Sequence, residues 1–324
     1  MFINGTCEYE YLFGNSHAFS EEQIDARVKM IRNAGFNAVR DAHQPHNLRY
    51  LQHWDRTGMM FWPQFSSHVW YDTPEFRQNF KQLLRQWIKE RRNSPSVIAW
   101  GLQNESTLPT DFAKECTEII REMDPMAREM RVVTTCNGGS GTDWNVIQNW
   151  SGTYGGDIFK YGEELMRPNQ LLNGEYGAWR TLGYHTEPCA FDPQGPWSEE
   201  HMCQILETKV GQAEKVRDKV CGHFQWLFST HDNPGRPRQP DEAYRMNDKV
   251  GPFNYKGLVS PWEEPTDAYY MYKGNYTKAS EAPFVYIISH TWPRRFNGPV
   301  IPLWKHIATV TPYASSTMPW MANS

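Results

Sequence analysis

Short apolar runs alternate with longer amphipathic segments along most of this chain. The segment "SEEQIDARVKMIRNAG" predicts a helix, because Ser20 can cap its start, Ile24, Val28 and Ile31 share one face, and Gly35 follows its end. Apolar strands that alternate with helices run parallel and are covered by those helices, in a closed barrel or in a doubly wound sheet. We count eight such runs, the first in "CEYEYLFG", and therefore predict an α/β fold of the (β/α)8 TIM barrel type.

Charge and apolar content exclude several classes of partner. The formal net charge of -4 leaves no basic footprint, so we expect no nucleic-acid partner. The sequence contains no apolar run of about 18 residues, so we expect no membrane partner. It also begins without the pattern of a signal peptide, so we expect a cytoplasmic protein as the sequence stands. A periplasmic or secreted location would follow if a preceding segment is missing.

Cysteine and aromatic residues narrow the class further. The six cysteines contain no CxxC pair, which favours reduced thiols over a zinc ribbon or a disulfide scaffold. The 14 Trp, 16 Tyr and 16 Phe residues either fill a large core or line a cleft for sugars, whose C–H faces pack on aromatic rings. Composition alone leaves both interpretations open.

Polar and aromatic side chains end or follow most of the apolar runs. In a barrel the carboxyl ends of the strands meet at one face, where functional groups gather. The residues predicted at this face are His17, Arg40, His43, Gln64, Asn104, Glu105, Glu175 and Trp226.

Glu105 and Glu175 form the candidate catalytic pair. They end the fourth and seventh apolar runs, so they can face each other across a bound sugar. Retaining glycoside hydrolysis uses two carboxyl groups about 5 Å apart, one as nucleophile and one as general acid/base. The acid needs a raised pKa, whereas the nucleophile must stay ionised. The alternative is that each glutamate caps a helix or lies in a solvated loop.

Several motifs resemble one known family. "GFNAVRDAHQPHNLRYLQHWDRTGMMFW", residues 35–62, and "RRNSPSVIAWGLQNES" resemble glycoside hydrolase family 2, the β-galactosidase and β-glucuronidase group. The resemblance extends from residue 2 to about residue 296. It implies that Glu105 is the general acid/base, that Glu175 in "NGEYGAW" is the nucleophile, and that Asn104 holds the sugar 2-hydroxyl.

The same resemblance assigns further residues to substrate binding. It implies that Arg40 supports the nucleophile, although Arg40 could instead pair with Asp41 or Asp55 as a structural ion pair. His43 matches the histidine of the R-x-x-H motif, and both His43 and His46 could alternatively cap the next helix. The other implied positions are His17 as a substrate contact, Trp226 as an aromatic platform, and Tyr154 as a candidate partner of the nucleophile.

Gln64 departs from the pattern of those family members that bind a metal after the third strand. A neutral amide is a poor ligand for a divalent ion, so we expect no catalytic magnesium and no other cofactor. "CNGGSG" lacks the Lys-Ser/Thr pair of a phosphate loop.

The two ends of the chain also differ from the family pattern. We expect residues 1–296 to form the barrel and residues 297–324 to be a tail outside the family. One choice of codons for "HIATV" encodes Tyr-Ser-Asn-Cys in a shifted reading frame, so we hypothesise a frameshift in the source gene. The family's flanking β-sandwich domains are not visible in this sequence, so an open cleft, a non-catalytic carbohydrate-binding barrel, and an oligomer all stay open.

The sugar that the chain would cleave is the least constrained part of the hypothesis. We expect a β-linked carbohydrate and favour a β-galactoside, the commonest activity of the group. β-Glucuronidase, β-mannosidase and endo-acting polysaccharide hydrolase are the alternatives. A glucuronide would need a basic or amide group such as Arg236 or Arg238, which could equally be part of a solvated turn.

Overall fold

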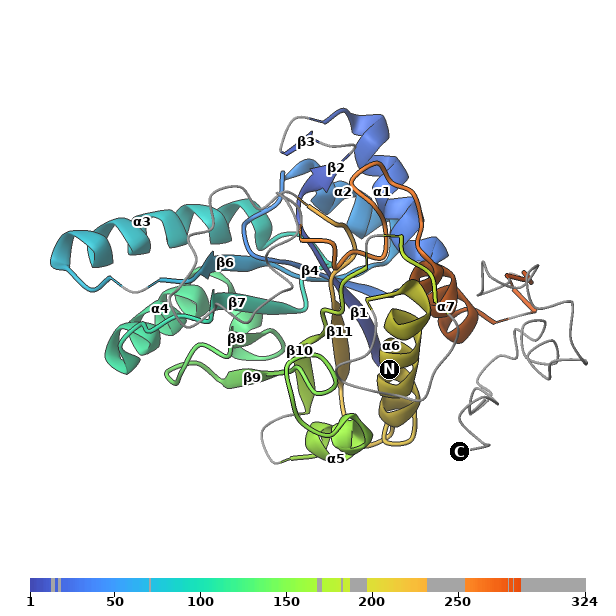
Figure 1. Cartoon of the computed structure of the whole chain (residues 1–324). Coiled ribbons are helices and arrows are strands. Elements are labelled where there is room, and N and C mark those ends of the chain that lie inside the picture. Colours follow the sequence, from blue (N-terminus) through green and yellow to red (C-terminus); the bar gives the residue numbers. More distant parts are fainter. Residues whose placement is uncertain are drawn as a thin grey trace, which may run out of the picture.

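The structure is a computed structural model in which residues 1–12, 15–16, 19–69, 71–167, 171–181, 183–186, 197–231, 254–278, 280–281 and 283–286 are described. Within them, nine strands form one parallel sheet (Figure 1). These strands are β1 (Ile3–Glu8), β4 (Ala38–Asp41), β5 (Met60–Trp62), β6 (Gln64–Ser67), β7 (Ala99–Asn104), β8 (Val132–Cys136), β9 (Trp144–Asn149), β10 (Leu172–Gly177) and β11 (Gly222–Trp226). A separate antiparallel pair joins β2 (Tyr11–Leu12) to β3 (Asn15–Ser16).

The sheet closes on itself at Pro63. The strand order runs from β5 through β4, β1, β11, β10, β9, β8 and β7 to β6, and only Pro63 separates β5 from β6. The Ile98 backbone N–H donates to the Phe61 carbonyl at 2.9 Å, and that of Gly101 donates to the Pro63 carbonyl at 2.9 Å. Proline has no N–H to donate to a ladder, which explains the break in this strand. With β5 and β6 as its two halves, the barrel has eight strands, which confirms the predicted fold and excludes the doubly wound sheet.

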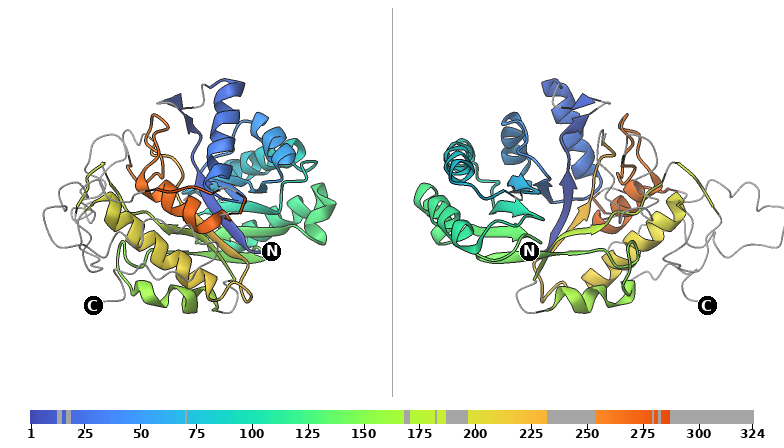
Figure 2. Two further views of the ribbon diagram at one scale, coloured as in Figure 1. Left: turned by 90° about the vertical axis from the view of Figure 1, so that its right-hand side faces the viewer. Right: turned by 60° about the vertical axis from the view of Figure 1, so that its left-hand side comes forward.

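Helices lie around the outside of the strands (Figure 2). They are α1 (Glu21–Asn33), α2 (Arg49–Thr57), α3 (Pro74–Arg91), α4 (Thr110–Met123), α5 (Tyr161–Leu165), α6 (Glu199–Glu214) and α7 (Asp267–Tyr276), with 3-10 turns η1 (Pro125–Arg128) and η2 (Ile158–Lys160). Ser20 forms a capping box with Gln23 at the start of α1, as its position before the amphipathic pattern predicts. None of the described helices is long and apolar enough to cross a membrane.

The first strand lies earlier in the chain than "CEYEYLFG" suggests. Closure of the ring pairs Ile3 with Gly222 and Thr6 with Gln225, so β1 begins at Ile3 and ends at Glu8. Tyr11 belongs to the separate hairpin instead. Its alternating pattern resembles a barrel strand locally, but only the partner strand determines which residues pair.

Gly222 provides a test of this closure. Its φ is +142°, and a β-carbon there would lie 2.2 Å from the Ile3 carbonyl oxygen. We therefore expect Gly222→Ala to lower the free energy of unfolding in urea by more than about 2 kcal/mol. Gly211, on the exposed side of α6 with open space around it, is the matched control. Gly211→Ala should raise stability by about 0.5 kcal/mol, because alanine favours helix. Equal effects of the two changes would contradict the closure argument.

Candidate active site

Glu175 lies near the carboxyl end of β10, with its carboxylate buried in the mouth of the barrel. Its side chain is 3% exposed, and its Oε1 accepts a hydrogen bond from Arg40 Nη1 at 2.7 Å. His43 Nε2 lies 3.6 Å from the same oxygen. The Glu175 backbone N–H donates to Asn173 Oδ1 at 2.9 Å, which fixes the strand at this point. A buried carboxylate held by an arginine is a group with a defined orientation.

Arg40 joins three strand ends through its guanidinium group. Beyond its bond to the nucleophile candidate, Nη1 donates to the Gly174 carbonyl at 3.1 Å. Nη2 donates to Gln64 Oε1 and to Asn104 Oδ1, both at 2.7 Å. The guanidinium carbon lies 4.7 Å from the centroid of the Trp62 ring. Arg40 is therefore fully buried and held from several directions, so it fixes the relative positions of β4, β6, β7 and β10 at the site.

Glu105 occupies a different environment from Glu175. It is the first residue after β7, with a φ of +43°, and its backbone N–H donates to the Cys136 carbonyl at 3.0 Å. Its side chain is 35% exposed, and its Oε2 lies 3.6 Å from His68 Nδ1. One carboxylate is thus buried beside an arginine, while the other is open to solvent, where a leaving group and water can enter.

The charges of the two glutamates depend on each other. Burial raises the pKa of Glu175 to about 7, the adjacent Arg40 cation opposes that rise, and the charge of Glu105 adds to it. The Arg40 cation therefore favours the charged form of Glu175, whereas the charge of Glu105 disfavours it.

An aromatic wall and two unpaired polar atoms complete the site. The rings of Trp226 and His43 stack with centroids 4.5 Å apart and planes 20° apart. Burial lowers the pKa of His43 well below its usual range, and nearby cations add to this effect, so its imidazole is neutral. His43 Nδ1 and Asn104 Nδ2 are buried and have no hydrogen-bond partner among the described residues. Buried polar atoms of this kind can bond the hydroxyl groups of a ligand.

The sequence of the barrel is similar to that of one known protein family. Residues 1–155 match the family model described as "Glycosyl hydrolases family 2, TIM barrel domain". Residues 1–155 thus form the first part of a family 2 glycosyl hydrolase barrel. This match includes Glu105, while Glu175 and Trp226 lie in the part of the same ring beyond it.

Individual relatives of this family 2 barrel carry two kinds of name. A β-glucuronidase of Bacteroides fragilis is 24% identical over 88% of this chain and 42% of its own length. A β-galactosidase of Thermoanaerobacterium thermosulfurigenes is 31% identical over 82% of this chain and 35% of its own length. The crystal structure of a β-glucuronidase from Parabacteroides merdae matches the fold with a TM-score of 0.77 and 23% identity, over 90% of this chain and 38% of that one. The chain thus spans about two fifths of the length of such relatives.

The family 2 barrel brings most of the predicted site residues together. Arg40, His43, Asn104, Glu105, Glu175 and Trp226 meet at the carboxyl ends of the strands. Tyr154 follows β9, where its hydroxyl group accepts a hydrogen bond from Arg180 at 3.2 Å, so its role toward the nucleophile stays a prediction. His17 and the tail at 297–324, like Arg236 and Arg238, lie outside the described residues.

His46, the second histidine of the motif region, belongs to a different group of charges. Its Nε2 bonds Glu8, and the Glu8 carboxylate also pairs with the buried Arg27. The His46 backbone N–H donates to Asp41 Oδ2 at 3.2 Å. His46 therefore connects β1 to the segment after β4, and it does not cap α2, whose N-cap residue is Leu48.

Three further residues reach the site that the motifs did not identify. His68 lies beside Glu105. Gln148 Nε2 donates to Asn104 Oδ1 at 3.4 Å. Lys256 is close enough for its charge to act on both Glu175 and His43. Of these three, only His68 has a signal in the local sequence, because it is a histidine directly after a strand at the carboxyl face of the barrel.

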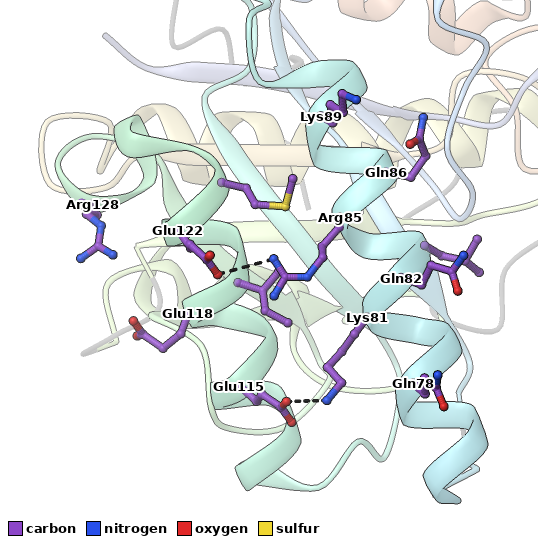
Figure 3. Close-up of a pocket in the computed structure, with 13 residues that line it drawn as sticks. Gln78, Lys81, Gln82, Arg85, Gln86, Lys89, Glu115, Glu118, Glu122 and Arg128 are labelled. Carbon is purple, nitrogen blue, oxygen red and sulfur yellow. Dashed lines mark hydrogen bonds and ion pairs between the residues drawn. The ribbon is translucent and has the colours of Figure 1, made fainter.

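A second concave surface lies outside the barrel and has a different character. A groove of about 1170 Å³ runs between α3 and α4 (Figure 3). Lys81 reaches across it to Glu115 at 2.5 Å, and Arg85 reaches Glu122 at 3.5 Å. Its lining residues belong only to α3, α4 and η1. Ion pairs at an exposed surface contribute little energy, so this groove is the solvated seam between two helices.

The environment of Glu175 predicts a displaced acid limb in the pH profile. The predicted nucleophile, Glu175, must be ionised to attack, and its pKa is raised to about 7, so we expect kcat/KM to fall as the pH drops through that value. Gln64→Glu adds a negative charge that competes for Arg40 and repels Glu175. We expect this variant to move the acid limb to higher pH by about one unit. Gln82→Glu, on the exposed face of α3, should leave it unchanged. An acid limb in the usual range of a glutamate would contradict the prediction.

Proposed function

We propose that this chain is a retaining β-glycoside hydrolase, with Glu175 as nucleophile and Glu105 as general acid/base. The observation that carries the proposal is the asymmetry of the pair. Glu175 is buried against Arg40, Glu105 is open to solvent, and the charge of one raises the pKa of the other. A double displacement needs this division between a fixed anion and an accessible acid.

The proposed reaction proceeds in two steps. In the first, a Glu175 oxygen bonds the anomeric carbon, the bond from that carbon to the leaving oxygen breaks, and Glu105 gives its proton to the leaving oxygen. In the second, Glu105 takes a proton from water, whose oxygen replaces Glu175 on the anomeric carbon. Asn104 Nδ2 and His43 Nδ1 are available to bond sugar hydroxyls, and Trp226 offers a ring face for the C–H surface of the sugar.

For the sugar itself, we infer that a β-linked uronic acid such as a glucuronide fits best. Lys256 is half-buried in the segment after β11, and its charge acts on Glu175 and His43. Burial is the main cause of the shifted pKa values of Glu175, His43 and His231, and the charge of Lys256 contributes to each of them. A sugar carboxylate in the site would be attracted by the charge of Lys256, whereas a neutral sugar would not. The β-glucuronidase name of the Bacteroides fragilis relative supports the same choice.

A β-galactoside is the second candidate. The Thermoanaerobacterium relative, 31% identical, is named β-galactosidase. A neutral hexose can use the bonding atoms of Asn104 and His43 without any ion pair to Lys256.

Hydrolysis of nitrophenyl β-glycosides tests both candidates. The panel contains the glucuronide, galacturonide, galactoside, glucoside and mannoside, each measured as kcat/KM on the intact chain. We expect the uronides to be cleaved at least about 100-fold faster than their neutral counterparts, because truncation of a buried charge pair costs about this much. Faster cleavage of the galactoside would favour the second candidate. A folded chain that cleaves none of them would contradict the proposed activity.

A further inference from the structure

The segments that follow β6 and β7 are joined by hydrogen bonds beyond the ends of both strands. The His68 backbone N–H donates to the Asn104 carbonyl at 3.0 Å, and the Thr107 backbone N–H donates to the Val69 carbonyl at 3.0 Å. Between them, the Val69 backbone N–H donates to Ser106 Oγ at 3.1 Å. These bonds hold His68 directly beside Glu105, so the backbone at the mouth of the barrel fixes the two residues next to each other.

Both residues of this pair adopt a backbone conformation that side chains disfavour. The φ angle is +53° at His68 and +43° at Glu105, and each is the first residue after its strand. The left-handed region costs a residue with a β-carbon about 1 kcal/mol and is found where surrounding structure imposes it, often at functional sites. Here it turns two side chains toward each other, with His68 Nδ1 3.6 Å from Glu105 Oε2.

The His68 ring also connects this pair to the rest of the site. It meets His43 edge to face, with ring centroids 5.7 Å apart and planes at 82°. His43 in turn lies 3.6 Å from Glu175 and stacks on Trp226. Each glutamate therefore has its own imidazole neighbour, and the two imidazoles are in contact along one wall of the site.

We propose that His68 is a positioning residue for the acid/base function of Glu105, which rests on the proposed glycosidase activity. A carboxylic acid that is 35% exposed beside a strand end has several rotamers, and only some of them aim its proton at the leaving oxygen. A ring nitrogen of His68 holds the carboxyl group in one of them. When Glu105 has given up its proton, an N–H of the imidazole can donate to the new carboxylate. The separation of 3.6 Å is longer than a hydrogen bond, and such contacts in free sites tighten when substrate binds.

This role predicts a dependence on the leaving group. A dinitrophenolate departs without a proton, so its release does not need Glu105, whereas a phenolate of high pKa does. His68→Phe keeps a ring against His43 but has no nitrogen. We expect it to lower kcat/KM for a phenyl β-glycoside about 30-fold and that for the 2,4-dinitrophenyl β-glycoside less than about 3-fold. His68→Asn places an amide N–H near the position of Nδ1 and should restore the phenyl substrate to within about 5-fold of wild type.

The experiment uses the glycone that the wild-type chain cleaves fastest, and thermal unfolding of each variant checks that the fold persists. An equal fall for both substrates in His68→Phe would show that the ring only supports His43 and would overturn the proposal. Failure of His68→Asn to recover more phenyl glycoside activity than His68→Phe would also overturn it. A wild-type chain that cleaves neither substrate would instead overturn the proposed activity, so the two failures are distinguishable.

Discussion

Replacing Glu175 by alanine is expected to lower the turnover of aryl β-glycosides at least about 10⁴-fold, the scale on which loss of a nucleophile acts. Without its carboxylate the anomeric carbon has no covalent partner, while Glu105 and the floor of the site stay in place. Azide can enter the space left by the side chain and attack that carbon directly. The product should then be a glycosyl azide of inverted configuration, which NMR identifies.

Glu105→Ala should give the complementary result. In this variant the first step still occurs with a dinitrophenyl substrate, because the dinitrophenolate leaves without a proton. The glycosyl-enzyme therefore forms and persists. Azide then displaces Glu175 and gives a glycosyl azide of retained configuration. Glu118→Ala on the exposed side of α4 is the control and should leave turnover within about 2-fold of wild type. Retained product from Glu175→Ala, or full activity in either variant, would contradict the assigned roles.

The second large effect concerns Lys256. Lys256→Gln removes its cation but keeps a polar side chain, so a uronate carboxylate in the site would lose its ion-pair partner. We expect kcat/KM for the β-glucuronide to fall about 100-fold relative to that for the β-glucoside. The ratio of the two substrates is the quantity to measure, because the charge of Lys256 also acts on Glu175 and changes both rates together.

Lys29→Gln provides the matched control for this change. Lys29 lies on α1 with its side chain 69% exposed, and its ion pair with Asp25 is local to that helix. It should leave the glucuronide-to-glucoside ratio unchanged. If Lys256→Gln also left the ratio unchanged, recognition of a uronate through this lysine would be excluded, and the β-galactoside candidate would gain.

The fold could be predicted from the sequence because its elements are locally encoded. The capping box at Ser20, the apolar face of α1, and Gly58 in the left-handed conformation after α2 are all short-range features. The predicted start of the first strand was wrong, because it depends on pairing with β11, which lies more than 200 positions away. The division of the third strand, in contrast, follows locally from Pro63, which has no N–H to donate to a ladder.

The candidate site was predictable only where a motif names it. Glu105 and Glu175 end apolar runs, and the family pattern identifies Arg40 and His43 beside them. The partners that set their chemistry have no such pattern. The sequence predicts Gln64 at the carboxyl face as a missing metal ligand, but it gives no sign that the amide oxygen accepts two hydrogen bonds from Arg40. Lys256 lies in a segment whose proximity to Glu175 exists only after the chain has folded.

The closed ring of strands also determines at which stage of folding the chain can begin to cleave substrate. Arg40 and Glu175 are 135 positions apart, and the ladder between β1 and β11 joins residues as distant as Thr6 and Gln225. Contacts between residues so far apart in the sequence form late in folding. Closing the long loop between them costs conformational entropy before the contacts contribute to stability. During refolding, helical circular dichroism should therefore return well before any cleavage of substrate, and recovery of cleavage would time the joining of the first strand to the last.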